Sequence, residues 1–235
     1  MTGGVSRAMD RSVFVVVPIY NEGPVIESSL TPLVDKGYSV VAVDDGSTDD
    51  TWSIVRSLPI YSLHHTVNLG QGAALQTGMA FALGRSAEFI VHFDADGQHN
   101  LDDIEVLLDP LRKDEADVVL GSRFLRESDR RAVPPGKRLL LRTGVIVNGL
   151  LTGVWLTDAH NGLRAFTRKA AARIDLHENG FAHATEILTQ IRRQKLRVVE
   201  RPTAIVYTER SMTKGQPMWN SIKIVLDILL RRIFR

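Results

Sequence analysis

The run VFVVVPIYNE, residues 13–22, decides the fold class of this chain. Its first five residues are apolar and mostly β-branched, without the polar alternation of a strand that has one face in water. Such a strand is covered on both faces, as in a parallel sheet between two layers of helices. Polar residues appear only where the strand ends, from Tyr20 to Glu22. The run therefore predicts the first strand of an α/β protein, with a polar motif at its carboxyl end.

The same alternation continues for the next hundred residues. Short apolar runs predict strands, and longer segments with helical spacing predict helices. The expected strands are 13–17, 39–43, 60–63, 89–93 and 118–120, and the expected helices are 25–35, 48–58, 72–83 and 104–111. Alternating strands and helices imply a mostly parallel, Rossmann-like sheet flanked by helices, with right-handed crossovers.

The pattern changes after Arg123. Residues 124–138 are polar and basic with a Pro-Pro-Gly break, which predicts a mobile loop. The remaining expected elements are a half-buried helix over 139–156, a strand over 161–166, a helix over 182–194, a strand over 204–207 and a final helix over 218–233. We therefore expect a tail over 1–11, one α/β domain over 12–217 and a basic amphipathic helix over 218–235.

Composition narrows the class of protein. The chain has 235 residues, a net charge of +2 and no cysteine. A disulfide framework, a cysteine-based zinc site and a cysteine nucleophile are excluded, and the composition suits the cytoplasm. No apolar run reaches 18 residues, so no complete membrane span is expected. Residues 210–235 hold six Lys/Arg against Asp227 alone, and such a basic tail can meet an anionic lipid surface or a nucleic acid; a solvated helix end is the alternative.

Four polar motifs follow the first four expected strands. They are PIYNE (18–22), DDGSTDD (44–50), NLGQG (68–72) and DADGQH (94–99). Ligands of open parallel sheets bind beyond the carboxyl ends of the strands. We therefore expect the four motifs to meet at one edge of the sheet and to form a single site.

The fourth motif predicts a metal site. Asp94 and Asp96 are carboxylates one residue apart at a strand exit, where both can reach the same divalent cation. Hard oxygen ligands select Mg²⁺ or Mn²⁺. Gln98 can add a carbonyl oxygen and His99 an imidazole. The alternative is an ordinary strand-to-helix loop in which an Asp caps the helix.

The second and third motifs predict nucleotide contacts. Asp45, supported by Asp44, can accept hydrogen bonds from a base N–H group or from ribose hydroxyls. Part of this motif is also explained by capping of the following helix. The turn at Gly70 precedes a helix, and backbone N–H groups at such a helix start suit a phosphate or a ribose. Glycine also serves ordinary turns, so the third motif is weak by itself.

The second half of the chain offers cations and candidate bases. Arg123 lies at a strand exit beside a cluster of basic residues that includes Arg138, and such a cluster can bind a diphosphate or a phosphate-bearing acceptor. A solvated loop is the alternative for most of the cluster. Asp158 or Glu186 can act as the general base for an acceptor hydroxyl.

Taken in order, the motifs resemble a known family. VVVPIYNEGPVI, VAVDDGSTDDT, NLGQGAALQTGMAFA, FDADGQH, VVLGSRF, TDAHNGLRAFTR and YTERSMTKG resemble the family 2 glycosyltransferases with the GT-A fold. Within them, the chain looks most like the dolichyl-phosphate mannose synthase group and its bacterial polyprenyl-phosphate relatives. The resemblance covers about residues 12–225, and the combination of motifs is more specific than any one of them.

The resemblance implies roles for individual residues. The donor, a GDP- or UDP-linked sugar, would be contacted by a set drawn from all the motifs: Pro18, Tyr20, Glu22, Asp44, Asp45, Gly70, Gln71, Asp94, Ala95 and Arg210. The metal would be held by Asp94, Asp96 and Gln98. The residues that act in catalysis would be Asp96, Asp158, Glu186, Arg123 and Arg138, the two arginines facing the diphosphate or the lipid phosphate. Arg210 would lie on a loop that closes over the donor.

Departures from the family pattern concern the donor and the acceptor. Many relatives have Lys where this chain has Gln71, and Ser-Gly-Phe-Arg where it has Asn161-Gly162-Leu163-Arg164. The QxxRW motif of processive polysaccharide synthases is absent, which indicates transfer of a single sugar.

The expected reaction is an inverting transfer of one sugar to a polyprenyl phosphate at the cytoplasmic membrane face. The phosphate oxygen is already anionic, so no strong base is needed. Alternatives are a hydroxyl acceptor, with Asp158 or Glu186 as base, and a non-catalytic nucleotide-sugar-binding module. A nucleotidyltransferase would need a Gly-rich, basic loop where this chain has PIYNEG. The implied partners are the donor, the acceptor, and a peripheral membrane contact or a membrane protein; no nucleic acid is expected.

Overall fold

The computed structural model describes residues 12–97, 99–127, 133, 135–158, 161–180 and 182–204. Four predictions lie outside these residues: the N-terminal tail over 1–11, Gln98 as a metal ligand, Arg210 with its closing loop, and the C-terminal amphipathic helix.

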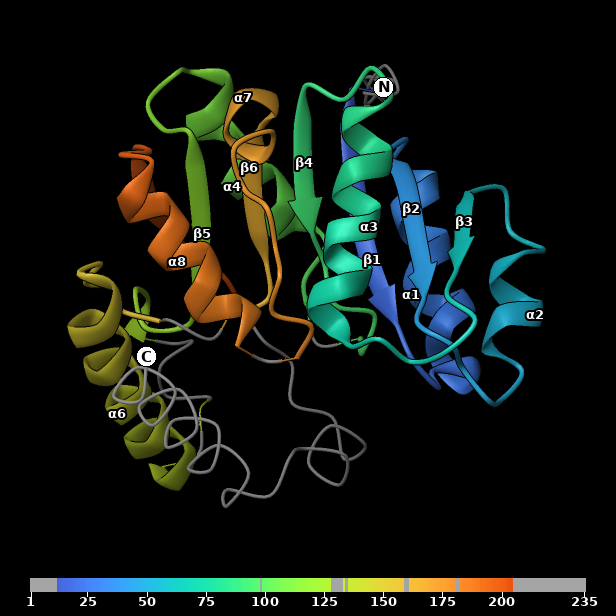
Figure 1. Ribbon diagram of the computed structural model, residues 1–235, viewed down its shortest axis with the longest axis horizontal. Coiled ribbons are helices and arrows are strands. Elements are labelled where there is room, and N and C mark those ends of the chain that lie inside the picture. The colour runs from blue at the N-terminus through green and yellow to red at the C-terminus, as the bar shows by residue number, and fades with distance from the viewer. Residues whose placement is uncertain are drawn as a thin grey trace, which may run out of the picture.

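A seven-stranded sheet forms the centre of the described chain (Figure 1). Its order is β3-β2-β1-β4-β6-β5-β7. The strands are β1 Val13–Ile19, β2 Ser39–Asp44, β3 Tyr61–His64, β4 Phe89–His92, β5 Val118–Ser122, β6 Arg164–Thr167 and β7 Val198–Pro202. All neighbours pair in parallel except β6, which is antiparallel to β4 and β5. The predicted mostly parallel α/β sheet is confirmed.

Helices cover both faces of the sheet (Figure 1). They are α1 Gly23–Asp35, α2 Thr51–Val55, α3 Gln71–Leu83, α4 Asp102–Arg112, α6 Pro135–Thr152, α7 Arg168–Ala171 and α8 His183–Arg193. The first strand shows why two layers are needed. Val13, Val15 and Val17 pack into the core beneath α1 and α4, and Phe14 and Val16 pack into the core beneath α3 and α8. The uninterrupted apolar run thus has one hydrophobic layer on each side, as the sequence predicts.

Three expected elements differ in extent. The helix expected over 48–58 is only Thr51–Val55, because the acidic loop before it extends to Asp50. The loop expected over 124–138 ends early, since α6 already begins at Pro135. Proline suits the first turn of a helix, where its missing N–H group has no partner to lose. That helix also ends before 156, at Thr152, followed by Gly153 with φ of +72°.

Most of the strand expected over 204–207 lies outside the described residues, and Ala204 itself is not in a strand. The last described strand, β7, covers Val198–Pro202 and pairs with β5 at the edge of the sheet. Its residues are all half-buried and include Glu200 and Arg201. An edge strand of this kind lacks the apolar run by which buried strands are recognised.

The carboxyl ends of β3, β2, β1 and β4 lie side by side, because these four strands are parallel neighbours. The four polar motifs therefore meet at one edge of the sheet, as expected. Among the helices that the structure describes, none has both the length and the apolar character to cross a bilayer.

Candidate active site

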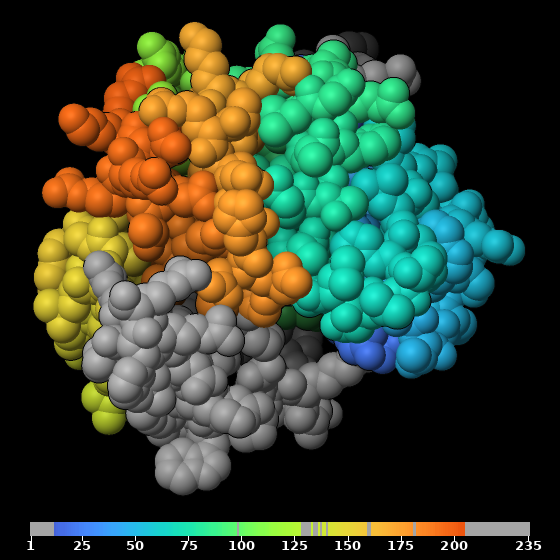
Figure 2. All heavy atoms as spheres, viewed as in Figure 1, coloured from blue at the N-terminus to red at the C-terminus, as the bar shows by residue number. Residues whose placement is uncertain are grey.

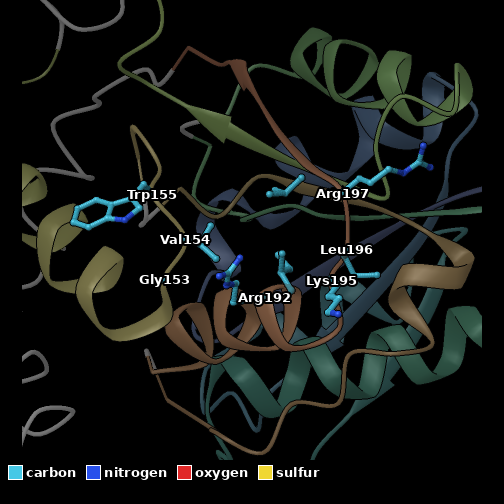
Figure 3. A pocket seen from close by; sticks show the side chains of 9 residues that line it. Gly153, Val154, Trp155, Arg192, Lys195, Leu196 and Arg197 are labelled. Atoms are coloured by element: carbon cyan, nitrogen blue, oxygen red, sulfur yellow. The ribbon is translucent and has the colours of Figure 1, made fainter.

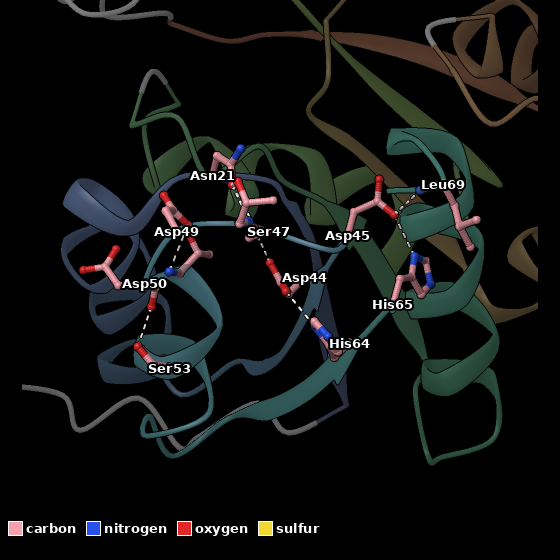
Figure 4. Close-up of polar contacts among 12 residues, drawn as sticks. Asn21, Asp44, Asp45, Ser47, Asp49, Asp50, Ser53, His64, His65 and Leu69 are labelled. Atoms are coloured by element: carbon pink, nitrogen blue, oxygen red, sulfur yellow. Dashed lines mark hydrogen bonds and ion pairs between the residues drawn. The ribbon is translucent and has the colours of Figure 1, made fainter. Parts of the chain in front are cut away.

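The loops after β1 and β2 are joined by hydrogen bonds (Figure 4). Asn21 donates its backbone N–H to Ser47 Oγ at 2.9 Å, and its Oδ1 accepts from the Thr48 N–H at 2.8 Å. Asn21 has φ of +54°, a left-handed conformation that Asn tolerates better than most residues. The first two motifs therefore form one structural unit.

The start of α1 belongs to the same unit. The backbone N–H of Glu22 donates to Thr51 Oγ1 at 2.9 Å, and that of Gly23 donates to Asp49 Oδ2 at 3.3 Å. A Cβ atom on Gly23 would collide with the Asp50 carboxylate. The acidic loop thus takes the place of a conventional helix cap, and α1 depends on it.

Asp44 is fully buried and accepts hydrogen bonds from Ser47 and from His64 Nδ1, the latter at 2.7 Å (Figure 4). His64 in turn stacks on Trp52, with ring centroids 4.7 Å apart. Asp44 therefore holds the loop after β2 in place from the interior of the protein.

Asp45 points to the third motif. Its carboxylate accepts from His65 Nδ1 at 2.7 Å and from the backbone N–H groups of Leu69 and Gly70, at 3.0 and 2.7 Å (Figure 4). His65 Nε2 lies 3.0 Å from Thr77 Oγ1 on α3. The predicted nucleoside-binding carboxylate is thus also the group that holds the 69–70 turn in place.

The glycines of the third motif allow a close approach of two chain segments. Gly70 has φ of +104°, and a Cβ atom on it would collide with the Asn179 carbonyl. The Gly72 N–H donates to that same carbonyl at 2.8 Å. Figure 2 shows the segment before α8 lying against the side of α3. The Gly72 N–H is therefore engaged by protein, not directed at a phosphate.

Asp94 is the best-defined carboxylate of the fourth motif. Gln71 Nε2 donates to its Oδ1 at 3.0 Å, and His99 Nε2 lies 3.5 Å from its Oδ2. Gly162 lies so close that a Cβ atom there would collide with the carboxylate. Burial raises the pKa of Asp94, but the His99 hydrogen bond and the charge of Arg164 outweigh it and hold the pKa below its ordinary value. Asp94 is therefore an anion at neutral pH.

The fourth motif fits a divalent cation in its chemistry. The Asp94 side chain is 28% exposed, and Asp96 and Gly97 are exposed. A Cβ atom on Gly97 would meet nothing within 4 Å, so there is open space beside the two carboxylates. Within the described ranges, no three His, Cys, Asp or Glu side chains form a complete metal site. Two carboxylates can still share a hard cation with diphosphate oxygens of a substrate.

Arg123 and Asp158 form a buried ion pair. Arg123 Nε lies 2.6 Å from Asp158 Oδ2, and Nη2 lies 2.7 Å from Oδ1. The Arg123 backbone N–H donates to the same carboxylate at 3.2 Å. The side chains are 7% and 1% exposed. The direction of the guanidinium at the end of β5 is thus set by Asp158.

The loop that carries Asp158 is fixed in turn. Glu200 of β7 accepts from Thr157 Oγ1 at 2.8 Å and from the Asp158 N–H at 3.2 Å. Ser122 Oγ lies 2.6 Å from Thr157 Oγ1, and Asn161 Nδ2 donates to Thr203 Oγ1 at 2.8 Å. The missed edge strand β7 is therefore what holds this side of the site.

Glu186 and Arg138 also contact backbone groups. The Glu186 carboxylate accepts from the N–H groups of His177 and Glu178 at 3.0–3.1 Å. Arg138 Nη2 donates to the Val133 carbonyl at 3.1 Å, and its buried Nε has no partner among the described residues. Glu186 thus holds the segment before α8 in place. Arg138 links the first turn of α6 to the backbone of Val133.

The remaining predicted donor contacts line the same edge. Tyr20 is 45% exposed, whereas Pro18 and Glu22 are half-buried. Ala95 is buried, and its carbonyl accepts from Ser29 Oγ of α1 at 2.9 Å. Tyr20 is thus the apolar surface of the first motif that a ligand can reach.

Arg164, His92 and His183 form a buried cluster that the sequence does not predict as part of the site. Arg164 opens β6, opposite His92 of β4, and lies within electrostatic range of Asp94 and Asp158. Burial and the charge of Arg164 hold the pKa of His92 well below its ordinary value, and that of His183 at about 4. Both ring nitrogens of His92 are buried without a partner in the described chain. Only the register of an inserted antiparallel strand brings these residues together, and no local pattern reveals it.

A hollow of about 370 Å³ lies away from the strand-end motifs (Figure 3). It is bordered by the turn after α6, the end of α8 and the start of β7, with Trp155, Arg192 and Lys195 among its lining residues. None of the predicted site residues lines it. The convergence of carboxylates, not the depth of a cavity, therefore locates the candidate active site.

The sheet order and the polar motifs at its strand ends are those of an α/β protein of the GT-A type. The sequence profile of glycosyl transferase family 2 matches residues 14–175, and the chain belongs to this family.

Two relatives span nearly the whole chain. A UDP-N-acetylglucosamine–dolichyl-phosphate N-acetylglucosaminyltransferase from Methanococcus voltae is 30% identical, covering 95% of this chain and 97% of its own. A polyprenol monophosphomannose synthase from Mycolicibacterium smegmatis is also 30% identical, over 89% of this chain and 82% of its own.

A solved structure shares the fold. Glucosyl-3-phosphoglycerate synthase from Mycobacterium tuberculosis, in complex with Mn²⁺ and UDP-glucose, superposes with a TM-score of 0.63 at 22% identity, covering 94% of this chain and 79% of that one. The resemblance noted in the sequence is thereby confirmed for the family and for the GT-A fold.

Proposed function

We propose that this protein is a metal-dependent, inverting glycosyltransferase. It moves one sugar from a UDP- or GDP-linked donor to a polyprenyl phosphate at the cytoplasmic face of a membrane. Support comes from the two relatives named for dolichyl-phosphate and polyprenol substrates, and from the strand-end motifs that meet at one edge of the sheet.

The observation that carries the choice of acceptor is the Arg123–Asp158 pair. Both oxygens of Asp158 accept from Arg123, and Glu186 accepts from two backbone N–H groups. A hydroxyl acceptor needs a base, and both candidate bases are engaged in holding other groups. A phosphate acceptor is already anionic and needs no base, so the engagement of both carboxylates favours it over a hydroxyl acceptor.

The donor side follows from the same geometry. We assign the nucleoside to the exposed ring of Tyr20 and to the loop that the Asp45 carboxylate holds in place, and Asp94 and Asp96 would hold Mg²⁺ or Mn²⁺. The ion, when bound, supplies positive charge to the departing nucleoside diphosphate. Inversion follows if the acceptor phosphate on the Arg123 side approaches the sugar from the face opposite that diphosphate.

The outer face of α6 supports a membrane contact. Leu139, Ile146 and Leu150 share one side of the helix and are 70%, 54% and 72% exposed, and Trp155 just beyond is 65% exposed. Apolar side chains with a nearby Trp suit the interface of a bilayer. The lipid tail of the acceptor would then remain in the membrane while its phosphate reaches Arg123.

The direct test offers labelled UDP- and GDP-sugars with either a polyprenyl phosphate or the corresponding free polyprenol. We expect product from the phosphate only, with Mn²⁺ or Mg²⁺ present and not with EDTA. Transfer to the free alcohol but not to the phosphate would overturn the acceptor. Equal transfer with EDTA and with Mn²⁺ would overturn the metal requirement.

Asp94→Asn provides the sharpest variant for this function. The amide keeps the shape of the side chain but removes the charge, so we expect transfer to fall by roughly 10²–10³-fold. The melting temperature measured in parallel reports whether the fold is retained. Wild-type transfer rates from a folded Asp94→Asn protein would contradict the assignment of Asp94 to the metal.

A further inference from the structure

Gln71, the first residue of α3, lies beside the carboxylate that would bind the metal. Its Nε2 donates to Asp94 Oδ1 at 3.0 Å. A carboxylate without a proton can only accept hydrogen bonds. The amide nitrogen, not the amide oxygen, must therefore face Asp94.

The backbone on both sides of Gln71 is held. The two preceding N–H groups, of Leu69 and Gly70, donate to Asp45 at 3.0 and 2.7 Å. The following N–H group, of Gly72, donates to the Asn179 carbonyl at 2.8 Å. The backbone of Gln71 is thus already fixed, so no backbone freedom is lost when its side chain hydrogen-bonds to Asp94.

The other neighbours of Asp94 complete a fixed cradle. His99 Nε2 lies 3.5 Å from Oδ2, and Gly162 is packed directly against the carboxylate. Gln71 holds Oδ1, so the carboxylate cannot rotate about its own axis without breaking a hydrogen bond. The amide does this without bringing a charge. Asp94 therefore keeps its negative charge for a cation.

We propose that Gln71 is a positioning residue for the divalent cation, acting through Asp94 and not through the donor. This inference rests on the proposed metal-dependent function. Outer partners that orient a metal-binding side chain commonly change metal affinity by about 10–100-fold when they are removed.

The test measures binding of Mn²⁺ alone, from the electron paramagnetic resonance signal of the free ion, without donor or acceptor. We expect Gln71→Ala to weaken binding by about 10-fold. Gln71→Asn, which is one methylene too short to reach Asp94, should weaken it similarly.

Gln76 provides a matched control on the same helix. Its Nε2 donates to Asp175 Oδ1 at 3.3 Å, and its Oε1 accepts from the Leu176 N–H at 2.9 Å, so this amide is bonded away from Asp94. Gln76→Ala should leave the Mn²⁺ affinity within about twofold of wild type. Melting temperatures of all variants separate a loss of fold from a loss of metal binding, and Gln71→Asn serves if Gln71→Ala proves unstable.

The outcomes separate this inference from the function on which it rests. Wild-type Mn²⁺ affinity in the Gln71→Ala and Gln71→Asn proteins overturns the role of Gln71 and leaves the metal site standing. Failure of the wild-type protein itself to bind Mn²⁺, together with activity in EDTA, overturns the metal site as well.

Discussion

Two sides of the candidate site are built in different ways. On the side that we propose for the nucleoside, at the ends of β1, β2 and β3, many single hydrogen bonds join the loops, among them those of Asn21, Asp44 and Asp45. On the side that we propose for the phosphate, at the end of β5, one buried ion pair between Arg123 and Asp158 dominates. The loops at the ends of β1, β2 and β3 are thus stabilised by many contacts, whereas the end of β5 is stabilised mainly by one.

The proposed function gives the two sides different ligands, and the difference in structure agrees with it. A nucleoside offers several neutral donors and acceptors, so its pocket needs many groups at fixed places. A phosphate offers concentrated charge, so it needs one well-directed cation. A buried guanidinium must itself be paired, or its desolvation destabilises the fold. The comparison therefore predicts that single substitutions harm the phosphate side more than the nucleoside side.

The largest effect is expected for Asp158→Asn. The variant leaves the Arg123 charge buried without its partner, which should lower the free energy of unfolding by about 3–5 kcal/mol. Urea denaturation measures this directly.

A double variant controls for the loss of charge itself. Arg123→Met combined with Asp158→Leu removes both charges and should recover much of the stability, because a well-packed apolar pair can replace a buried ion pair. Sugar transfer should stay lost. A loss below 1 kcal/mol in Asp158→Asn would mean that the two sides of the site do not differ in the way described.

The next effect concerns pH and His183, which is buried near Arg164. Burial holds the pKa of His183 at about 4 in the folded protein, below its ordinary value of 6.5. Between these values the unfolded chain binds a proton that the folded chain does not. The contribution is therefore fully present above pH 6.5 and is lost as the pH falls toward 4, by about 3 kcal/mol in total.

Denaturation of wild type and His183→Gln across pH 4–7 tests this expectation. The difference in unfolding free energy between the two proteins should change over that window, in favour of the variant at low pH. His177→Gln, at an exposed position before α8, is the control and should follow the wild-type curve. Parallel curves for wild type and His183→Gln would sink the assignment.

The smallest effect is expected on the nucleoside side, at Asn21. Asn21→Gly keeps the left-handed backbone and loses the side-chain hydrogen bond, at a cost of about 1 kcal/mol. Asn21→Ala loses the bond and also strains the backbone, for about 2 kcal/mol in all. Thermal unfolding of both variants tests the order. A larger loss for Gly than for Ala would show that the φ of +54° does not matter here.

The sequence predicts the nucleoside side better than the phosphate side. Runs such as Val13–Val17 are buried on both faces, so their composition alone marks them as strands, and the polar residues after them mark the strand ends. Parallel neighbours then bring those ends together without further information. This reasoning is local to each motif, which is why it places Asp45 and Asp94 correctly at one edge.

The phosphate side depends on contacts between distant segments. Asp158 reaches Arg123 across 35 residues, because the chain returns antiparallel through β6. Glu200, which fixes the loop of Asp158, lies on an edge strand whose half-exposed residues resemble a loop in sequence. Neither the pairing nor the second role of Asp158 can be read from the spacing of residues.

The insertion of β6 between β4 and β5 also has a consequence for the newly made chain. When β5 leaves the ribosome, β4 is paired only with β1. Its other edge, at Ile90 and Val91, pairs with Phe166 and Ala165 only after β6 has been made. An apolar strand with an open edge invites pairing with other chains. Synthesis of this protein therefore includes an interval, ending when Thr167 emerges, in which this edge of the nascent sheet has no partner strand from its own chain.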